Sequence, residues 1–371
     1  DFARAEDIAL SIVGPEAPLV AGIVDYFKAK DLACFGPTQG AAQLEGSKAF
    51  SKDFLQRHNI PTAAYAVFSE EEQAIEYLKN QSMPIVIKAD GLAAGKGVII
   101  AQSLDEACAT VKDMLSGNSF GEAGHRVVIE EFMRGEEASF IALVDGRTAL
   151  PFASSQDHKA RDDGDKGPNT GGMGAYSPAP VVTPEVHERI MAEVIIPTVR
   201  GMAAEGNTYT GFLYAGLMIT PEGQPKVVEF NCRFGDPEAQ PVMMRLQSDL
   251  VSLCQSALEQ KLDEAEISFD PRPCVGVVLA AGGYPNSYAK GNVISGLDAD
   301  HGTSAKIFHA GTKLQDGQVV TSGGRVLCAT ALGDSVTAAQ QVAYALADAI
   351  HWDQVYYRKD IAYRAIAREK S

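Results

Sequence analysis

The chain has 371 residues, of which 46% are hydrophobic and 22% are charged, and it contains 35 glycines. This length exceeds what a single hydrophobic core fills, and the composition is that of an ordinary globular protein, so we expect two to four packed units rather than disorder. The formal charge of -16 opposes non-specific binding to nucleic acid or to an anionic membrane surface, because the field of the protein repels both. We therefore expect no nucleic-acid or membrane partner, and any anionic ligand must be held by local Lys, Arg and backbone N–H groups.

The apolar runs and the cysteines exclude two further classes. The longest apolar stretches, such as residues 273–281, are far shorter than the ~20 residues that span a bilayer. The six cysteines are widely scattered and form no Cys-x-x-Cys pair or zinc-like cluster with histidine. We therefore expect a cytoplasmic protein with buried, reduced thiols.

The first elements predict a parallel βαβ unit. Residues 8–13 form a short apolar run that Gly14 and Pro15 stop, which is typical of a strand buried on both faces. An amphipathic stretch at 19–30 predicts a helix, and residues 33–35 predict the second strand.

Two α+β units are expected next. In the first, Ser47 can cap a helix at 48–58 and Ser103 a helix at 104–115, with strands at 85–88, 98–101, 127–132 and 138–144. The second has a helix at 184–205 and strands at 212–219 and 226–231. Between the two units, residues 154–180 are polar and glycine-rich. A connector of this length without secondary structure is usually functional, so it is a candidate site.

The remaining chain has the sequence pattern of short strands joined as β-hairpins. Strands are predicted at 275–280, 306–310, 319–322 and 325–331, followed by a helix at 335–350 and a basic tail. The proline-bearing stretch 270–273 is the expected linker.

A lysine and a glycine-rich segment point to a triphosphate. The predicted strand 85–88 delivers Lys88 into a segment that contains Gly91, Gly95, Lys96 and Gly97. The ammonium group and N–H groups without Cβ obstruction are what a triphosphate needs. The spacing is not that of a P-loop, because only three residues separate Gly91 from Gly95 and a glycine follows Lys96. A hairpin with permissive glycines is the alternative.

A polar strand is the second candidate. Residues two apart on a strand face the same side, so Glu229, Asn231 and Arg233 are expected to project into one site, with Val228 and Phe230 buried. Carboxylate and amide oxygens suit Mg²⁺, and a guanidinium can bind a transferring phosphate. An amphipathic strand with a surface ion pair would show the same pattern.

An acidic hinge is the third candidate. The apolar strand from Val127 ends in acids and leads to Glu137. The backbone of such a hinge can pair with an adenine edge, and a carboxylate beyond the turn can accept ribose hydroxyls. A solvated charged turn would look similar.

Taken in this order, these elements resemble the ATP-grasp superfamily, in which two α+β lobes clamp ATP. The resemblance implies metal ligation by Glu229 and Asn231 and ribose contact by Glu137. The ATP-binding residues that it implies are Lys48, Lys88, Gly95, Lys96, Gly97, Glu130, Glu131, Phe132, Met133 and Glu137.

Further motifs resemble the phosphoribosylamine–glycine ligase (glycinamide ribonucleotide synthetase) family. They are Gly14-Pro-Glu16, Leu44-Glu-Gly-Ser-Lys48, Ser155-Gln-Asp157-His158-Lys159, Pro168-Asn-Thr170-Gly171-Gly172-Met173-Gly174 and Glu229-Phe-Asn231-Cys-Arg233-Phe-Gly-Asp236. The resemblance implies that ATP and glycine give glycyl phosphate, which 5-phosphoribosylamine attacks to form glycinamide ribonucleotide for purine biosynthesis. It implies Mg²⁺ or Mn²⁺ as the metal, these small molecules as partners, and a monomer or weak homodimer.

The resemblance also implies roles for particular residues. Catalysis falls to Arg233, Lys88 and Asp236, and substrate binding to Glu16, Asp157, His158, Lys159, Thr170, Gly171, Gly172, Met173, Gly174 and Arg233. Within the segment from Asp157, Lys159 supplies positive charge and Asp157 can hold an amine. His158 is more often a structural hydrogen-bonder than a base.

Two departures from the family pattern matter. Many ATP-grasp enzymes carry another metal-binding acid on the preceding strand, yet residues 212–219 offer only Tyr214 as a polar side chain. The family also begins with a strand and a Gly-Asn-Gly-Gly-Arg-Glu-His loop. We expect roughly sixty residues of that kind to be missing before Asp1, since a βαβ unit without its first strand is incomplete, and we expect turnover to suffer.

The implied architecture is α/β and α+β: an ATP-grasp fold with a partial Rossmann-like N-terminal domain and a small α+β C-terminal domain. The expected domains are 1–45, 46–270 with a small lobe at about 64–137, and 271–371. The alternatives are another ATP-grasp carboxylate-amine ligase or purine enzyme, such as a biotin-carboxylase-like or formyl-transferring one, and a catalytically impaired protein that only binds nucleotide.

Overall fold

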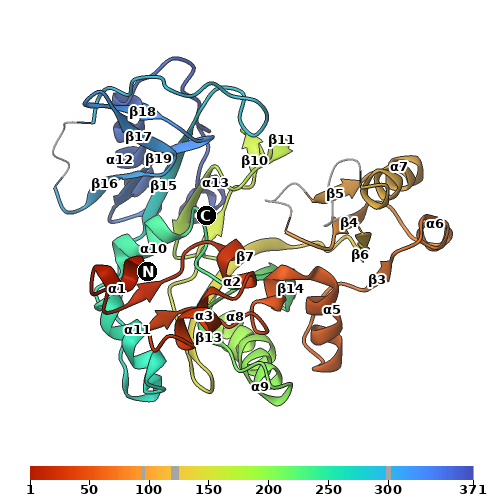
Figure 1. The fold of residues 1–371 in the computed structure, drawn as a ribbon. Coiled ribbons are helices and arrows are strands. Elements are labelled where there is room, and N and C mark those ends of the chain that lie inside the picture. Colours follow the sequence, from red (N-terminus) through yellow and green to blue (C-terminus); the bar gives the residue numbers. More distant parts are fainter. Residues whose placement is uncertain (93–96, 118–124, 298–301, 371) are drawn as a thin grey trace. The chain divides into compact units, whose positions relative to one another are not determined.

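The computed structural model describes residues 1–92, 97–117, 125–297 and 302–370 (Figure 1). The chain forms two compact units, each built from segments that lie far apart in the sequence. The first comprises Asp1–Pro151, Thr183–Phe234 and Leu250–Glu266, and the second Phe152–Val182, Gly235–Asp249 and Ile267–Ser371. Among the described residues, no helix is both long and apolar enough to cross a bilayer.

The first unit opens with α1 (Phe2–Ala5) and a small parallel sheet of β1 (Ser11–Ile12) and β2 (Cys34–Phe35). The predicted parallel pairing is confirmed. The expected burial of the first strand on both faces is wrong, because Ile12 is 40% exposed. The single predicted helix is two helices, α2 (Glu16–Val20) and α3 (Ile23–Lys28), because Gly22 between them adopts φ +85°.

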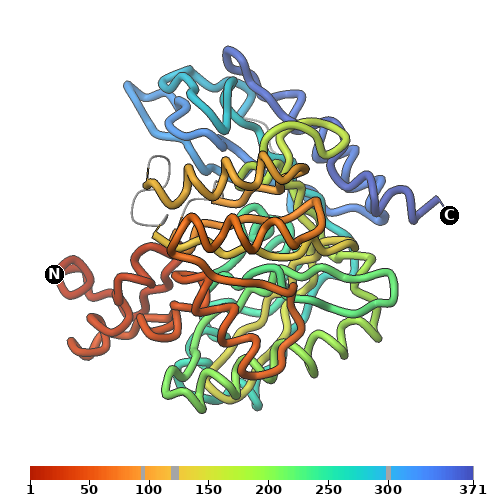
Figure 2. Tube along the Cα trace, turned by 90° about the vertical axis from the view of Figure 1, so that its right-hand side faces the viewer, coloured from red at the N-terminus to blue at the C-terminus, as the bar shows by residue number. Residues whose placement is uncertain are grey.

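A four-stranded antiparallel sheet forms the small lobe of the first unit, in the order β3-β6-β4-β5. Its strands are β3 (Tyr65–Phe68), β4 (Ile85–Ala89), β5 (Val98–Ala101) and β6 (Val127–Glu131). Helices α6 (Glu71–Leu78) and α7 (Leu104–Leu115) run side by side and pack on this sheet (Figures 1 and 2). The buried side chains of Ala74, Ile87, Val111 and Ile129 belong to the core that holds helices and sheet together.

A second antiparallel sheet of the first unit has the order β14-β13-β7-β8. Its strands are β7 (Glu136–Asp145), β8 (Ala149–Pro151), β13 (Thr210–Ile219) and β14 (Pro225–Asn231). The predicted helix at 184–205 consists of α8 (Pro184–Ile190), a π-helical turn (Met191–Ile195) and α9 (Ile196–Ala204). The other helices of this part are α4 (Gln43–Gly46), α5 (Lys48–Arg57) and α11 (Leu250–Leu258).

Strand β14 contains a bulge that corrects one expectation. Glu229 lies opposite Gly216, whereas the next pair is Val227 with Leu217, so Val228 is the extra residue. The buried residues of the strand are Pro225, Val227 and Phe230, and Val228 is partly exposed. Simple alternation predicted a buried Val228, and the bulge makes that prediction wrong.

The second unit is centred on a five-stranded sheet in the order β16-β19-β15-β12-β9. Its strands are β9 (Gln156–Asp157), β12 (Gly174–Ser177), β15 (Cys274–Ala280), β16 (Ala305–His309) and β19 (Arg325–Leu332). Helix α12 (Val336–Ala349) packs on β15 and β19, α10 (Ala239–Arg245) contacts β12, β15 and β19, and α13 (Tyr363–Glu369) ends the chain. A hairpin of β17 (Thr312–Gln315) and β18 (Gln318–Thr321) completes the unit.

The polar segment 154–180 is not a structureless loop. It contributes β9 and β12 to the sheet of the second unit and forms a hairpin of β10 (Ala160–Asp162) and β11 (Lys166–Asn169). Strand β12 pairs with β15, whose residues come much later in the chain. The segment is therefore held by long-range pairing.

Candidate active site

The start of helix α5 is tied to the end of strand β4. Ser47 Oγ accepts a hydrogen bond from the N–H of Phe50, as expected of an N-cap. Asp90 adds a second cap, because its Oδ1 accepts from the N–H of Ala49 at 2.7 Å and from Ser47 Oγ at 3.0 Å. Lys48 Nζ donates to the carbonyl of Gly91 at 3.0 Å. The predicted phosphate-binding lysine thus lies at the glycine-rich segment.

Lys88 lies against the bulged strand β14. Its Nζ donates to the carbonyl of Val228 at 3.0 Å and lies 2.9 Å from Glu130 Oε1, while the side chain is almost fully buried. Lys52 Nζ lies 2.8 Å from the other oxygen of the same carboxylate. The structure therefore brings Lys88 together with the strand that carries Glu229 and Asn231.

Burial lowers the pKa of the two lysines of α5, Lys48 and Lys52. Burial lowers the pKa of Lys48, and the carboxylate of Glu229 opposes this effect. Burial likewise lowers the pKa of Lys52 to about 8, against the attraction of Glu130. Sequence reasoning missed Lys52, although its spacing of four from Lys48 places both on one face of α5.

The metal-binding prediction rests on Glu229 and Asn231. Strand register places them opposite Gly216 and Tyr214, on the side away from the buried Phe230, and both are partly exposed. Within the described residues, no group of three His, Cys, Asp or Glu side chains could hold a metal ion. Two hard oxygen ligands suit Mg²⁺, which usually takes one or two protein ligands and completes its shell with phosphate and water. The residues present fit that ion.

Arg233 is held by two carboxylates. Its Nε lies 3.4 Å from Glu16 Oε2, and its Nη2 lies 3.1 Å from Glu45 Oε1. Glu45 also accepts from the N–H of Cys232 at 2.6 Å, and burial raises the pKa of its carboxyl to about 7 although Arg233 opposes the shift. Glu16, predicted to bind substrate, is in this structure a partner of Arg233. Glu45 was given no role in the prediction, although it lies in the family-like motif Leu44-Glu-Gly-Ser-Lys48.

The predicted adenine hinge divides into two environments. Glu130 is buried and faces the two lysines described above. Glu131 is exposed, accepts from the N–H of Ala64 at 3.2 Å and lies 3.5 Å from Lys226 Nζ. Phe132 is 39% exposed, Met133 is partly exposed, and Glu137 is exposed at the start of β7. Gly97 is buried immediately before β5, whereas Gly95 and Lys96 lie outside the described residues.

In the second unit, Thr170 organises the turn after β11. Its N–H and Oγ1 both donate to the carbonyl of Lys159, at 2.7 and 2.8 Å, and its Oγ1 accepts from the N–H of Gly172. Arg325 Nη1 donates to the carbonyl of Gly171 at 2.5 Å, and Arg325 Nη2 donates to Asp236 Oδ2 at 2.7 Å. Asp236, predicted to be catalytic, is therefore paired with Arg325, a residue of the family-like motif Gly323-Gly-Arg325 to which the sequence assigned no role.

Close contacts within the protein explain why Gly172 and Gly174 have no room for a side chain. A Cβ on Gly172, whose φ is +111°, would lie 2.3 Å from Pro237 Cδ, and one on Gly174 would lie 2.6 Å from the carbonyl oxygen of Gly276. Met173 between them is fully buried in the core of the unit. The Met173 side chain, predicted to bind substrate, is thus a packing group, because it points into that core.

His158 is almost fully buried at 1% exposure. Its Nε2 accepts from the N–H of Ala362 at 2.9 Å, which fixes the proton on Nδ1, and Nδ1 lies 3.8 Å from Asp165 Oδ1. Burial lowers the pKa of the imidazole, with Asp165 opposing the shift. The ring is a structural hydrogen-bonding group here and presents neither nitrogen to solvent.

The buried imidazole predicts how stability changes with pH. The pKa of His158 is lowered in the folded protein, so between its ordinary value near 6.5 and the lower folded value the unfolded chain binds a proton that the folded chain does not. Stability is then complete above pH 6.5 and falls below it, by at most about 1.4 kcal/mol per pH unit for this group. In urea unfolding from pH 7.5 to 5, we expect His158→Gln to flatten that decline. Equal slopes for both proteins would contradict the assignment.

Sequence comparison identifies the family. The sequence models of the three domains of phosphoribosylglycinamide synthetase match the chain: the N domain at residues 1–45, the ATP-grasp (A) domain at 46–239 and the C domain at 274–364. The chain belongs to the phosphoribosylglycinamide synthetase family. Relatives named phosphoribosylamine–glycine ligase include one from Pseudomonas aeruginosa, 70% identical, and one from Vibrio cholerae, 68% identical. Each alignment covers 100% of this chain and 86% of the relative.

Solved structures agree with this family and with the ATP-grasp fold. The crystal structure of phosphoribosylamine–glycine ligase from Thermotoga maritima superposes with a TM-score of 0.84 at 37% identity, over 91% of this chain and 84% of the other. The biotin carboxylase domain of 2-oxoglutarate carboxylase from Hydrogenobacter thermophilus reaches a TM-score of 0.74 at 17% identity, over 96% and 77% of the two chains. The second likeness concerns the fold alone. The predicted fold class is confirmed.

Proposed function

We propose that this chain ligates glycine to 5-phosphoribosylamine at the expense of ATP, giving glycinamide ribonucleotide, ADP and phosphate. The structural observation that carries the proposal is the hydrogen bond from Lys88 Nζ to the carbonyl of Val228, which joins the lysine strand to the strand bearing Glu229 and Asn231. Relatives that are 65–70% identical over the whole chain and bear the name of that ligase support it.

The first chemical step needs positioning more than proton transfer. A carboxylate is a poor electrophile, so the γ-phosphoryl group of ATP passes to glycine and gives glycyl phosphate. Stabilisation of charge on the transferring group dominates such a step. Lys88 and Lys48 supply fixed positive charge beside the glycine-rich segment, and Arg233 supplies a guanidinium held by Glu16 and Glu45. Glu229 and Asn231 would hold Mg²⁺, which supplies charge neutralisation at phosphate oxygens when bound.

The nucleotide is proposed to bind through residues of the first unit. The hinge from Glu131 to Met133 offers backbone groups to adenine, and Glu137 accepts the ribose hydroxyls. Glu130 acts differently, because its buried carboxylate holds Lys52 and Lys88. Gly95, Lys96 and Gly97 remain proposed as phosphate contacts.

The second step joins the amine of phosphoribosylamine to the acyl carbon of glycyl phosphate, with phosphate leaving. We assign substrate binding to Asp157, Lys159 and the turn from Thr170 to Gly174. Support comes from the partly exposed Asp157 and Lys159 and from the turn, whose backbone Thr170 and Arg325 fix. Asp236 belongs to the same arrangement through its ion pair with Arg325.

Three finer features also belong to the proposal. Mn²⁺ is an alternative to Mg²⁺, since both are hard cations that accept oxygen ligands. The protein acts as a monomer or weak homodimer on small molecules. The proposed domains are 1–45, 46–270 and 271–371, a division supported by the residues that the three domain models match, although the compact units combine segments from more than one of these ranges.

ADP formation by the purified protein tests the function directly. We expect ADP release from ATP to require glycine and phosphoribosylamine together with a divalent cation, because the acyl phosphate must be consumed for turnover. Bicarbonate or formate in place of glycine should give less than about a tenth of that rate, since a missing ammonium group leaves its binding partner unpaired. Activity that follows bicarbonate or formate would assign the chain to a different carboxylate.

A further inference from the structure

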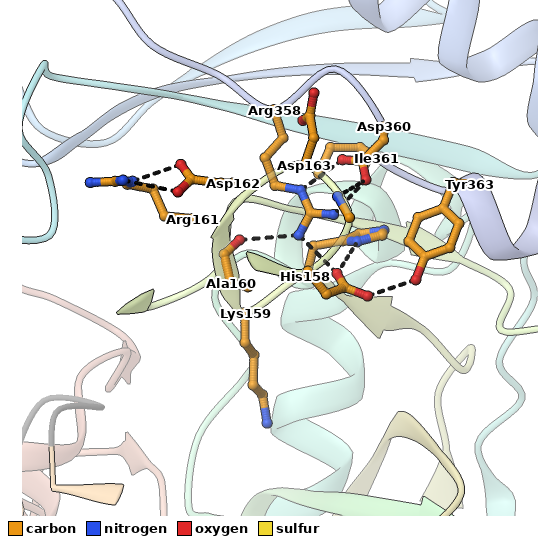
Figure 3. A network of polar contacts seen from close by, with 12 residues as sticks. His158, Lys159, Ala160, Arg161, Asp162, Asp163, Arg358, Asp360, Ile361 and Tyr363 are labelled. Atoms are coloured by element: carbon orange, nitrogen blue, oxygen red, sulfur yellow. Dashed lines mark hydrogen bonds and ion pairs between the residues drawn. The ribbon is translucent and has the colours of Figure 1, made fainter. Parts of the chain in front are cut away.

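An ionic network in the second unit, with a buried guanidinium and partly exposed carboxylates, links the segment 158–165 to residues 358–364 (Figure 3). Arg358 is its centre, and the side chain is 0% exposed. Its guanidinium donates to the carbonyl of Ala160 at 3.1 Å, to Asp165 Oδ1 at 3.0 Å and to both carboxylate oxygens of Asp360 at 2.8 Å. The guanidinium therefore makes four hydrogen bonds within the protein, three of them to carboxylates.

The same two segments are joined by further hydrogen bonds. Tyr363 Oη donates to Asp165 Oδ2 at 2.6 Å, and Arg364 Nη2 donates to the same oxygen. The backbone takes part as well, because the N–H of Ala362 donates to His158 Nε2 and the N–H of Gly164 to Asp360 Oδ2. These contacts join residues that are about two hundred positions apart in the sequence. Residues 358–364 therefore help to hold the hairpin in place.

The side chains of the connection between β9 and β10 point in different directions, and this separates the network from the side chain predicted to meet substrate. The His158 ring and the carbonyl of Ala160 contact the network, whereas the Lys159 side chain points away from it (Figure 3). The backbone of Lys159 is held from the other side, where Thr170 donates twice to its carbonyl. A change in the pairing of β10 with β11 would therefore move the Lys159 side chain and the carbonyl that Thr170 holds.

A buried guanidinium is a poor choice for stability alone. Taking the guanidinium out of water costs several kcal/mol, and apolar residues of similar volume often stabilise a core as well or better. Paired buried charges instead penalise every arrangement that separates them. Here, the pairing of Arg358 with Asp165 favours the conformation in which the Lys159 side chain points away from the network.

We propose that Arg358 and Asp165 are positioning residues that fix the register of the substrate hairpin, defined as residues 157–174, and thereby the placement of Lys159 and Thr170. The inference rests on the proposed function, because it assigns the hairpin to glycine and phosphoribosylamine. Neither residue touches a substrate in this scheme.

The test compares Michaelis constants in a graded series of variants. Tyr363→Phe removes one hydrogen bond to Asp165, Asp165→Asn removes its charge, and Arg358→Lys keeps the charge but loses the fork of donors. Arg161→Gln is the matched control, because Arg161 forms a two-bond pair with Asp162 on the same hairpin but points away from the network (Figure 3).

We expect the KM for glycine or phosphoribosylamine to rise about 10-fold in Asp165→Asn and Arg358→Lys and about 2-fold in Tyr363→Phe, since misplacement by 1 Å can cost up to 10²-fold. The KM for ATP should stay within about 2-fold in all variants, and Arg161→Gln should match the unsubstituted protein. Amide hydrogen exchange at residues 158–174 should accelerate in the same order.

Several results would overturn the proposal. One is an equal rise of all three Michaelis constants, and another is faster exchange of the hairpin with unchanged constants, since either describes general loosening. If Arg358→Lys does not fold, the Michaelis constants of Tyr363→Phe and Asp165→Asn test the proposal, because both variants keep Arg358. A lack of glycine-dependent ADP formation in the unsubstituted protein would reject the proposed function itself, whereas an active protein without the selective rise would reject only the positioning role.

Discussion

Replacement of Lys88 by methionine is expected to lower the rate of glycine-dependent ADP formation by about 10²- to 10³-fold, the usual effect of removing one donor to the transferring group. The ammonium is fixed by Glu130 and by the carbonyl of Val228, so it is already in place before the reaction and needs no reorganisation. Quenched-flow measurement of ADP formed in the first turnover reports this step directly.

Loss of a buried ion must be separated from loss of catalysis. Lys88→Met leaves Glu130 buried with Lys52 as its remaining lysine partner among the described residues, and breaking a buried pair costs about 3–5 kcal/mol of stability. The control Lys52→Met breaks the second ion pair of the same carboxylate. We expect similar losses of stability in the two single variants, but a large loss of first-turnover rate only in Lys88→Met.

A triple variant completes that experiment. Lys88→Met with Lys52→Met and Glu130→Gln removes all three charges of the cluster and should recover much of the lost stability, measured by urea unfolding, because no uncompensated buried charge remains. The rate should not recover. A triple variant that regains turnover within a few-fold of the unsubstituted protein would show that Lys88 acts only through folding.

Replacement of Arg233 by glutamine is expected to slow single-turnover formation of glycyl phosphate by about 10²-fold, because one donor to the transferring group is lost. The two carboxylates that hold the guanidinium, from Glu16 and Glu45, fix where it points. Glu45→Gln keeps a hydrogen-bonding group at that position and should give an intermediate loss.

The matched control is Arg147→Gln. Arg147 belongs to the same unit, lies 3.9 Å from Asp263 Oδ1 and is mostly exposed, so its ion pair contributes little. The rate of glycyl phosphate formation by Arg147→Gln should equal that of the unsubstituted protein. Formation of glycyl phosphate by Arg233→Gln within a factor of two of that rate would remove Arg233 from the mechanism.

Local patterns predicted the regular elements well. Serine caps predicted the starts of α5 and α7, and the structure has Ser47 and Ser103 in those positions with their side chains accepting from the first turn. Short apolar runs predicted β4 and β5, which pair with each other. These features depend on a few neighbouring residues, and for that reason the sequence contains them.

Features that depend on distant partners were missed or mistaken. The segment 154–180 was predicted as a loop because its pairing with β15 has no local signature. The bulge at Val228 shifted the buried positions of β14 for the same reason, since register is a property of two strands. The β3 strand and α6 helix were not predicted either.

The candidate site shows the same division. Sequence motifs singled out Lys48, Lys88 and Glu229, and the structure brings β4, β14 and the start of α5 together. The supporting residues Asp90, Glu45 and Arg358 were not identified, because each acts through a neighbour supplied by folding. A sequence motif identifies the residues proposed to contact substrates, but not the residues that position their side chains.

The order of strands in the second unit has a consequence for synthesis on the ribosome. Ser177 of β12 pairs with Cys274, so roughly a hundred further residues must be translated before β12 meets β15, which takes about 5–20 s at ordinary elongation rates. During that interval β12 has only the short β9 beside it, and the newly made edge is open to other chains. Slow codons or chaperone binding between residues 180 and 274 would therefore affect the yield of native protein more than the same events near the start of the chain.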